Sequence, residues 1–264
     1  FTYKSIVNYC DTGNNQQLLR AKNIFRPKYE VLDKLNESIS FLDNKVAKFF
    51  ADKTTNQSRV ERTKYMPAHL LPRIYGSSEN FFVMSLEDGI PLSKVYCKNM
   101  IVSLLNYMFT NFWNNSHSDN TFNERCYAFY NTKTLDRIKL SLEGNMAIDY
   151  HIINKQDIGD IQSLMKKVDF ESLSNGIPTT FHGDFILENI LLKKDGTYCL
   201  VDWRQDFQGL LKYGDMYYDL AKLMHGLIIS HDIINDNLYT FDRSMNEIKY
   251  DFLRKNINID CEEI

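Results

Sequence analysis

The stretch from Phe181 to Phe207, FHGDFILENILLKKDGTYCLVDWRQDF, constrains the fold more than any other part of the sequence. Two apolar runs, NILL and TYCLVDW, flank a Lys-Asp-Gly turn, a pattern that is typical of a β-hairpin. In an antiparallel hairpin the start of the first strand lies beside the end of the second. The pattern therefore predicts that Asp184, Asn189 and Asp202 meet at one edge of the hairpin.

These three side chains suit phosphoryl transfer. The oxygens of Asn189 and Asp202 are hard donors for Mg²⁺, which takes few protein ligands and shares itself with phosphates. The carboxylate of Asp184, left off the metal, can accept a hydrogen bond from an attacking hydroxyl. Each residue alone fits an ordinary loop or strand-end polar group equally well. The three together, at this spacing, favour a functional site.

The remainder of the chain divides into a strand-rich part and a helical part, so we expect an α+β fold. A small lobe is expected at 27–89, with its linker at 84–89, and a larger helical lobe at 90–264. The expected strands are 29–35, 38–42, 45–50 and two runs around the turn at 76–78. The expected helices are 58–66, 94–113, 123–142, 158–168 and 215–230.

The composition excludes several classes of protein. The net charge of −3 argues against a nucleic-acid binder. Five dispersed cysteines without a C-x-x-C pair indicate reduced thiols in a cytoplasmic protein. We expect no membrane span, because no apolar run is long enough, and no signal peptide. The chain begins at Phe1 rather than Met, so we expect it to be part of a longer protein.

The motif H-G-D-x-x-x-x-N, followed by an apolar strand and VDW, resembles the aminoglycoside phosphotransferase and choline kinase family, relatives of protein kinases. The segment YGDMYYDLAKL is similar to the G-D-x-x-x-D-L-A helix start of that family. The resemblance implies a protein-kinase-like two-lobed fold that uses ATP and Mg²⁺. It implies the roles of catalytic base for Asp184, metal ligands for Asn189 and Asp202, loop brace for His182, and structural support for Asp215 and Asp219.

The strand KVAKFF resembles the V-A-I-K strand of kinases, which implies that Lys48 binds phosphate. The alternative is an edge-strand lysine that reaches water. Glu61, on the next expected helix, is the candidate partner of Lys48, but Ser58 to Glu61 also reads as a capping box, in which the glutamate caps its own helix. The backbone from Met84 to Leu86 is expected to meet the adenine.

Kinases cover the phosphates with a glycine-rich loop, and the matching turn here, LNESISF, contains no glycine. We expect the side chains of Ser38 and Ser40 to donate hydrogen bonds to the nucleotide instead. The missing glycines keep open the alternative of a catalytically weak or inactive nucleotide-binding module, a pseudokinase.

The substrate is expected to contact the residues that follow the second strand, namely Trp203, Arg204 and Asp206. The family phosphorylates small hydroxyl compounds and often has an acid after the D-W pair. Arg204 at this place favours a neutral or anionic substrate, such as a sugar. The expected acceptor is a sugar, an alditol or an amino alcohol. Choline and aminoglycosides remain alternatives.

Residues 1–26 include YCDTGNNQQLLRAK, which resembles the segment near the end of sugar-nucleotide and choline-phosphate nucleotidyltransferase domains. An ordinary strand, turn and helix is an equal alternative. If the resemblance holds, the chain is the kinase part of a covalently fused nucleotidyltransferase and kinase. That pairing fits the synthesis of precursors for bacterial capsular and other surface polysaccharides.

Overall fold

The computed structural model describes residues 13–14, 16–17, 35–113, 117, 119–144, 149–229, 233–234, 236–244 and 247–252. The strand expected at 29–35 and the nucleotidyltransferase-like motif in residues 1–26 fall almost entirely outside these residues. The small lobe, the hairpin and most of the large lobe are described, and they carry the site.

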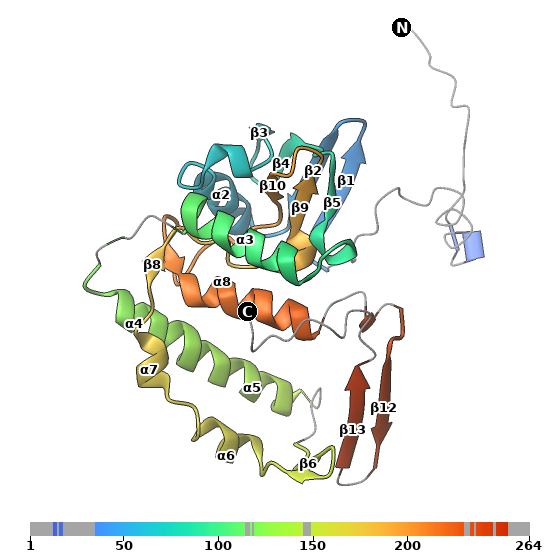
Figure 1. The fold of residues 1–264 in the computed structure, drawn as a ribbon, viewed down its shortest axis with the longest axis vertical. Coiled ribbons are helices and arrows are strands. Elements are labelled where there is room, and N and C mark those ends of the chain that lie inside the picture. Colours follow the sequence, from blue (N-terminus) through green and yellow to red (C-terminus); the bar gives the residue numbers. More distant parts are fainter. Residues whose placement is uncertain are drawn as a thin grey trace, which may run out of the picture.

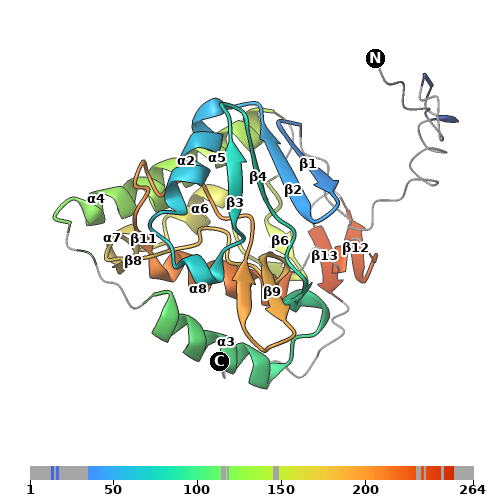
Figure 2. The same cartoon turned by 90° about the horizontal axis from the view of Figure 1, so that it is seen from above.

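The small lobe is an antiparallel sheet in the order β1-β2-β4-β3. Its strands are β1 (Glu37–Leu42), β2 (Lys45–Phe50), β3 (Ile74–Ser77) and β4 (Phe81–Ser85). Figure 2 shows the four strands in a row, with α2 beside them. Alternate residues of β2, namely Val46, Lys48 and Phe50, are buried, as expected for a strand with one face on the core. The strands predicted for this lobe at 38–42, at 45–50 and around the turn are confirmed.

Helix α2 (Lys53–Arg62) connects β2 to the rest of the lobe. It begins at Lys53 because the carboxylate of Asp52 accepts the backbone N–H groups of Thr54 and Thr55 at 3.0 and 3.1 Å. A helix was expected here, but its predicted start at Ser58 is wrong. Ser58 lies in the second turn of α2, so the capping box predicted from Ser58 to Glu61 does not exist.

The predicted hairpin is confirmed. Strand β9 (Ile190–Lys193) pairs with β10 (Tyr198–Leu200), and Gly196 takes a positive φ of 83° in the turn. A third strand that the sequence did not predict, β5 (Gly89–Pro91), pairs with β9. The linker is therefore shorter than expected, since Ser85 ends β4 and Gly89 begins β5.

The large lobe is mostly helical, as predicted. In Figure 1, α8 lies between α3 above and α5 below. A five-residue π-helical segment at 128–132 joins α4 to α5 in the region predicted as one helix. The helices are α3 (Lys98–Asn111), α4 (Phe122–Tyr127), α5 (Lys133–Glu143), α6 (Ile161–Met165), α7 (Phe170–Ser174) and α8 (Met216–Ile228), with 3₁₀ turns at Ala68–Leu70, Leu92–Lys94 and Leu187–Asn189.

Two further sheets in this lobe were not predicted. A two-stranded sheet joins β8 (Pro178–Thr179) to β11 (Gly214–Asp215). A second sheet has the order β12-β13-β6-β7 and lies at the edge of the molecule (Figure 1). Its strands are β12 (Tyr239–Arg243), β13 (Glu247–Phe252), β6 (Ile152–Ile153) and β7 (Gln156–Asp157).

One hydrophobic core joins the two lobes. It runs from Phe50 and Phe82 of the small sheet through Trp203 to Leu104 of α3 and Leu223 of α8. The rings of Phe82 and Trp203 stack with their centroids 6.2 Å apart. The predicted α+β fold, with a small antiparallel-sheet lobe and a larger helical lobe, is confirmed. None of the helices in the described part of the chain is long and apolar enough to cross a membrane.

Candidate active site

The H-G-D loop is fixed by its histidine. His182 is fully buried, its Nε2 donates to the carbonyl of Val201 at 3.0 Å, and its Nδ1 accepts the backbone N–H of Asp184 at 3.2 Å. Burial lowers the pKa of His182 to about 4, so the ring is neutral at pH 7, as these two hydrogen bonds require. His182 therefore ties the loop to the end of the hairpin, where a loop brace is expected.

Asp219 of α8 holds the same loop from the other side. Its carboxylate accepts the backbone N–H groups of His182 and Gly183, both at 2.7 Å, and the indole N–H of Trp113 at 3.1 Å. Burial raises the pKa of Asp219 to about 6, although these hydrogen bonds act in the opposite direction. Asp215 caps α8 and accepts the hydroxyl of Tyr130 at 2.6 Å. Both acids thus occupy supporting positions rather than exposed ones.

Asp184 and Asn189 lie together, as the hairpin geometry predicts. The amide nitrogen of Asn189 donates to the backbone oxygen of Asp184 at 2.9 Å and to its Oδ2 at 3.1 Å. The other carboxylate oxygen of Asp184 forms an ion pair with Lys222 of α8 at 2.8 Å. Lys222 was not predicted, because it lies 38 residues away in the sequence and just after the G-D-x-x-x-D-L-A pattern, which assigns it no role.

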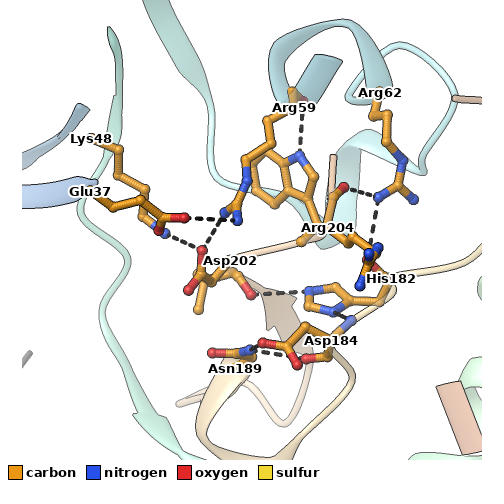
Figure 3. A network of polar contacts seen from close by, with 11 residues as sticks. Glu37, Lys48, Arg59, Arg62, His182, Asp184, Asn189, Asp202 and Arg204 are labelled. Carbon is orange, nitrogen blue, oxygen red and sulfur yellow. Dashed lines mark hydrogen bonds and ion pairs between the residues drawn. The ribbon is translucent and has the colours of Figure 1, made fainter. Parts of the chain in front are cut away.

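Asp202 faces the small lobe. Its Oδ1 accepts Lys48 Nζ at 2.9 Å and Arg59 Nη1 at 2.5 Å (Figure 3). The residue adopts a left-handed backbone, with φ of 58°, which is uncommon outside glycine and frequent at functional sites. The backbone N–H of Val201 donates to the carbonyl of Asn189 at 2.9 Å, so the hairpin register holds Asp202 and Asn189 at the same edge.

The residues at this edge fit Mg²⁺ shared with a nucleotide. With its nitrogen turned to Asp184, the amide of Asn189 keeps its oxygen as a donor for a metal, and Asp202 supplies a carboxylate. Among the described residues, no group of three or more His, Cys, Asp and Glu side chains could hold a metal ion. A site with few protein ligands is what Mg²⁺ needs when phosphates complete its coordination.

Glu61 was predicted either to pair with Lys48 or to cap its helix, and it does neither. Its carboxylate pairs with Lys64 Nζ at 2.6 Å and accepts the hydroxyl of Tyr65 at 3.4 Å, on the outer face of α2. The buried face of α2 carries Arg59 instead, which reaches Asp202 and lies 3.9 Å from Glu37. The buried face of α2, where the sequence predicted the carboxylate of Glu61, therefore carries the guanidinium of Arg59.

The prediction for Ser38 and Ser40 is also wrong. Strand β1 alternates half-buried and exposed residues, and both serines are on the exposed face. In the β1–β2 register Ile39 pairs with Lys48, whereas Ser38 pairs with Phe49. Because directly paired residues share a face of the sheet, both serines point away from the face that carries Lys48.

The predicted adenine contact at Met84 to Leu86 needs a correction. Met84 is a buried strand residue of the core. The backbone N–H groups of Ser85 and Leu86 donate to the carbonyls of Arg73 and Asn44, both at 2.9 Å. These two donors are occupied within the small lobe, so they do not face an adenine ring.

Of the three residues expected to meet the substrate, Trp203 is in the core. It is 1% exposed, and its indole N–H donates to the carbonyl of Arg59 at 2.8 Å. Arg204 and Asp206 are half-buried, and Arg204 Nε donates to the backbone oxygen of Asp206 at 3.0 Å. Trp203 therefore positions α2 against the hairpin and does not line a substrate site.

Arg62 joins α2 to the loops of the site, and no motif in the sequence predicted it. The side chain is 1% exposed and its guanidinium lies over the ring of Phe181, 3.9 Å from the centroid. Burial lowers the pKa of Arg62 to about 9. It donates to the backbone carbonyls of Phe181, His182, Arg204 and Leu211.

Residues 161–238 match the model of the phosphotransferase enzyme family. The resemblance predicted from the sequence is confirmed. The matched region contains the H-G-D loop, the hairpin and α8.

Two solved structures are similar to this chain. The ethanolamine kinase from Plasmodium vivax has 16% sequence identity and a TM-score of 0.42, and the match covers 72% of this chain. This chain spans 60% of the length of that protein. The choline kinase LicA from Streptococcus pneumoniae has 15% identity and a TM-score of 0.41, with 83% of this chain and 78% of that chain covered. No curated protein matches the sequence.

Proposed function

We propose that the chain is a small-molecule kinase that transfers the γ-phosphate of ATP to a hydroxyl group. The observation that carries this proposal is the edge of the hairpin, where Asp184 and Asn189 are hydrogen-bonded and Asp202 pairs with Lys48. Catalysis of this transfer is mostly positioning and charge neutralisation, and these residues supply both.

Each side chain has a definite part in the proposed reaction. Asp184 accepts the proton of the attacking hydroxyl, and Lys48 binds the phosphates of ATP. Asn189 and Asp202 hold Mg²⁺, which when bound neutralises the phosphate charge. His182 and Asp219 keep the loop of Asp184 in place through the backbone.

The proposed acceptor is a sugar, an alditol or an amino alcohol, in the synthesis of precursors for bacterial surface polysaccharides in the cytoplasm. A nucleotidyltransferase domain fused before this chain would then activate the phosphate ester. Choline and an aminoglycoside are the alternative acceptors. The segment 1–26 motivates the pathway, and the family match supports the reaction.

A pseudokinase is the second candidate, and one contact favours it. Arg59 Nη1 contacts Oδ1 of the expected metal ligand Asp202 at 2.5 Å, and the segment LNESISF contains no glycine. Both features are compatible with a module that binds a nucleotide but does not transfer its phosphate.

The replacement Asp184→Asn separates the two candidates. We expect it to lower substrate phosphorylation by about 10²-fold or more, because a positioned base contributes this much, while ATP with Mg²⁺ still raises the melting temperature. Asp251→Asn, an exposed acid of β13, is the matched control and should behave like the natural chain. The assay is a phosphorylation screen of sugars, alditols, amino alcohols, choline and aminoglycosides. ATP binding without turnover of any of them would favour the pseudokinase.

A further inference from the structure

Three cations gather beside the H-G-D loop. Lys133 and Arg137 lie one turn apart on α5, and Arg204 follows the hairpin. Lys133 Nζ and Arg204 Cζ both lie over the ring of Phe129, at 4.5 and 5.2 Å from its centroid. We call Lys133, Arg137 and Arg204 the basic cluster.

The basic cluster carries more positive than negative charge, since Asp206 is the acid whose charge acts on Lys133. Within the described part of the chain, none of its three members forms an ion pair with a carboxylate. Arg204 donates to a backbone oxygen and to the hydroxyl of Tyr218 at 3.5 Å. Burial, followed by the charges of Arg204 and Arg137, lowers the pKa of Lys133 to about 8. Positive charges held together in this way attract an anion.

The basic cluster lies next to the proposed catalytic base. A Cβ atom added to Gly183 would lie 2.5 Å from the Cβ of Arg204, so the arginine packs on the residue that precedes Asp184. Tyr218, which accepts from Arg204, is one turn before Lys222 on α8, and Lys222 pairs with Asp184. The basic cluster therefore lies beside the loop and the helix that hold Asp184.

We propose that the acceptor alcohol carries an anionic group, a phosphate or a carboxylate, which Arg204 and Lys133 bind while its hydroxyl reaches Asp184. This inference rests on the proposed function. In the reaction, the hydroxyl oxygen forms a bond to the γ-phosphorus, the bond from that phosphorus to the bridging oxygen of ADP breaks, and the hydroxyl proton passes to Asp184. A cationic alcohol is disfavoured, because its charge would meet the basic cluster.

The test compares three-carbon alcohols that differ in charge: glycerol, glyceric acid, glycerol 1-phosphate and 3-amino-1,2-propanediol. With ATP and Mg²⁺ saturating, we expect kcat/KM for an anionic member to exceed that for glycerol about ten-fold or more, with the amine lowest. The two anionic members distinguish phosphate from carboxylate as the bound group. A neutral or cationic member that is used as well as the better anionic one would overturn the proposal.

The variants Arg204→Met and Lys133→Met should each remove most of the preference by raising KM, with kcat little changed. Lys139→Met is the matched control, since this lysine is on the same helix but is exposed and pairs with Glu143. An unchanged preference in both cluster variants would refute the assignment.

Direct binding decides the case in which no alcohol of the set is phosphorylated. With ADP and Mg²⁺ present, calorimetry measures the affinity of the chain for inorganic phosphate and for acetate, the two probes of the basic cluster. We expect binding of at least one probe that weakens about ten-fold in Arg204→Met. No binding of either probe, or equal binding in the variant, overturns the proposal. If Asp184→Asn leaves ATP turnover unchanged, the proposed kinase function fails, whereas loss of probe binding in Arg204→Met would still support the anion site.

Discussion

The replacement of Arg62 by methionine tests how the lobes are held together. Methionine keeps much of the side-chain volume but removes every donor. Within the described residues, the carbonyls of Phe181, Arg204 and Leu211 receive no other hydrogen bond, whereas that of His182 also accepts the N–H of Arg204. Three carbonyls would therefore lose their donor.

A buried polar group without a partner costs about 1–3 kcal/mol, so we expect the free energy of unfolding to fall by about 3–5 kcal/mol in Arg62→Met. Arg62→Lys should lose about 2 kcal/mol or more, because one ammonium group cannot reach carbonyls arranged around a planar guanidinium. Substrate phosphorylation should fall as well, since the loops that Arg62 holds carry Asp184 and Asp202.

The assay is equilibrium unfolding in urea, followed by the fluorescence of the two buried tryptophans, Trp113 and Trp203. The control is Arg73→Met, an exposed arginine over the ring of Tyr75, for which we expect a change within about 0.5 kcal/mol. A loss below about 1 kcal/mol in Arg62→Met would refute the conclusion that this side chain braces the loops.

Two further predictions concern the same loop. The pKa of His182 is about 4 in the folded chain against an ordinary 6.5, so its contribution to stability is complete above pH 6.5 and is lost as the pH falls to 4. The pKa of Asp219 is about 6 against an ordinary 3.8. Its contribution to stability is therefore complete below pH 3.8 and is lost as the pH rises through 6. In His182→Gln only the dependence of Asp219 remains, so the free energy of unfolding in urea should fall as the pH rises from about 4 to 7. In Asp219→Asn only the dependence of His182 remains, so it should rise over the same range. Each change should reach up to about 3 kcal/mol, and parallel pH profiles of the two variants would contradict both assignments. Gly183→Ala should lower the free energy of unfolding by about 1–2 kcal/mol more than Gly196→Ala, because both positions have φ above 80° but only the first would press a Cβ on Arg204. Equal losses in urea would show that the close contact with Arg204 has no energetic effect.

The sequence predicts the hairpin side of the site well. Asp184, Asn189 and Asp202 are separated by few residues, and the turn at Gly196 fixes how the two strands pair. Local rules are sufficient there, because the register of a short hairpin decides which side chains share an edge.

The small-lobe predictions failed for a different reason. Helix α2 buries Asn56, Arg59 and Arg62, which are polar, so the periodicity that marks the buried face of a helix is absent. The actual start of α2 is marked by Asp52, an ordinary capping residue, but the motif at Ser58 was the more conspicuous one. Which face of α2 is buried depends on carbonyls more than 100 residues away.

The outer sheet was missed because its pairing is long-range. Strand β6 has two residues, and it pairs in parallel with β13, about 95 residues later. No turn connects such strands, and a two-residue strand carries no alternation that could be recognised.

The pairing of Asp202 with Lys48 and Arg59 has a consequence for how the free chain meets a nucleotide. Two side chains with one positive charge each already stand at the carboxylate that is proposed to hold a doubly charged metal. Both side chains contact Oδ1 of Asp202, so they repel a metal that approaches this carboxylate, and the phosphates of the nucleotide are the groups that can attract them away. Entry of the nucleotide is therefore an exchange of partners, and metal and phosphates are expected to arrive as one unit.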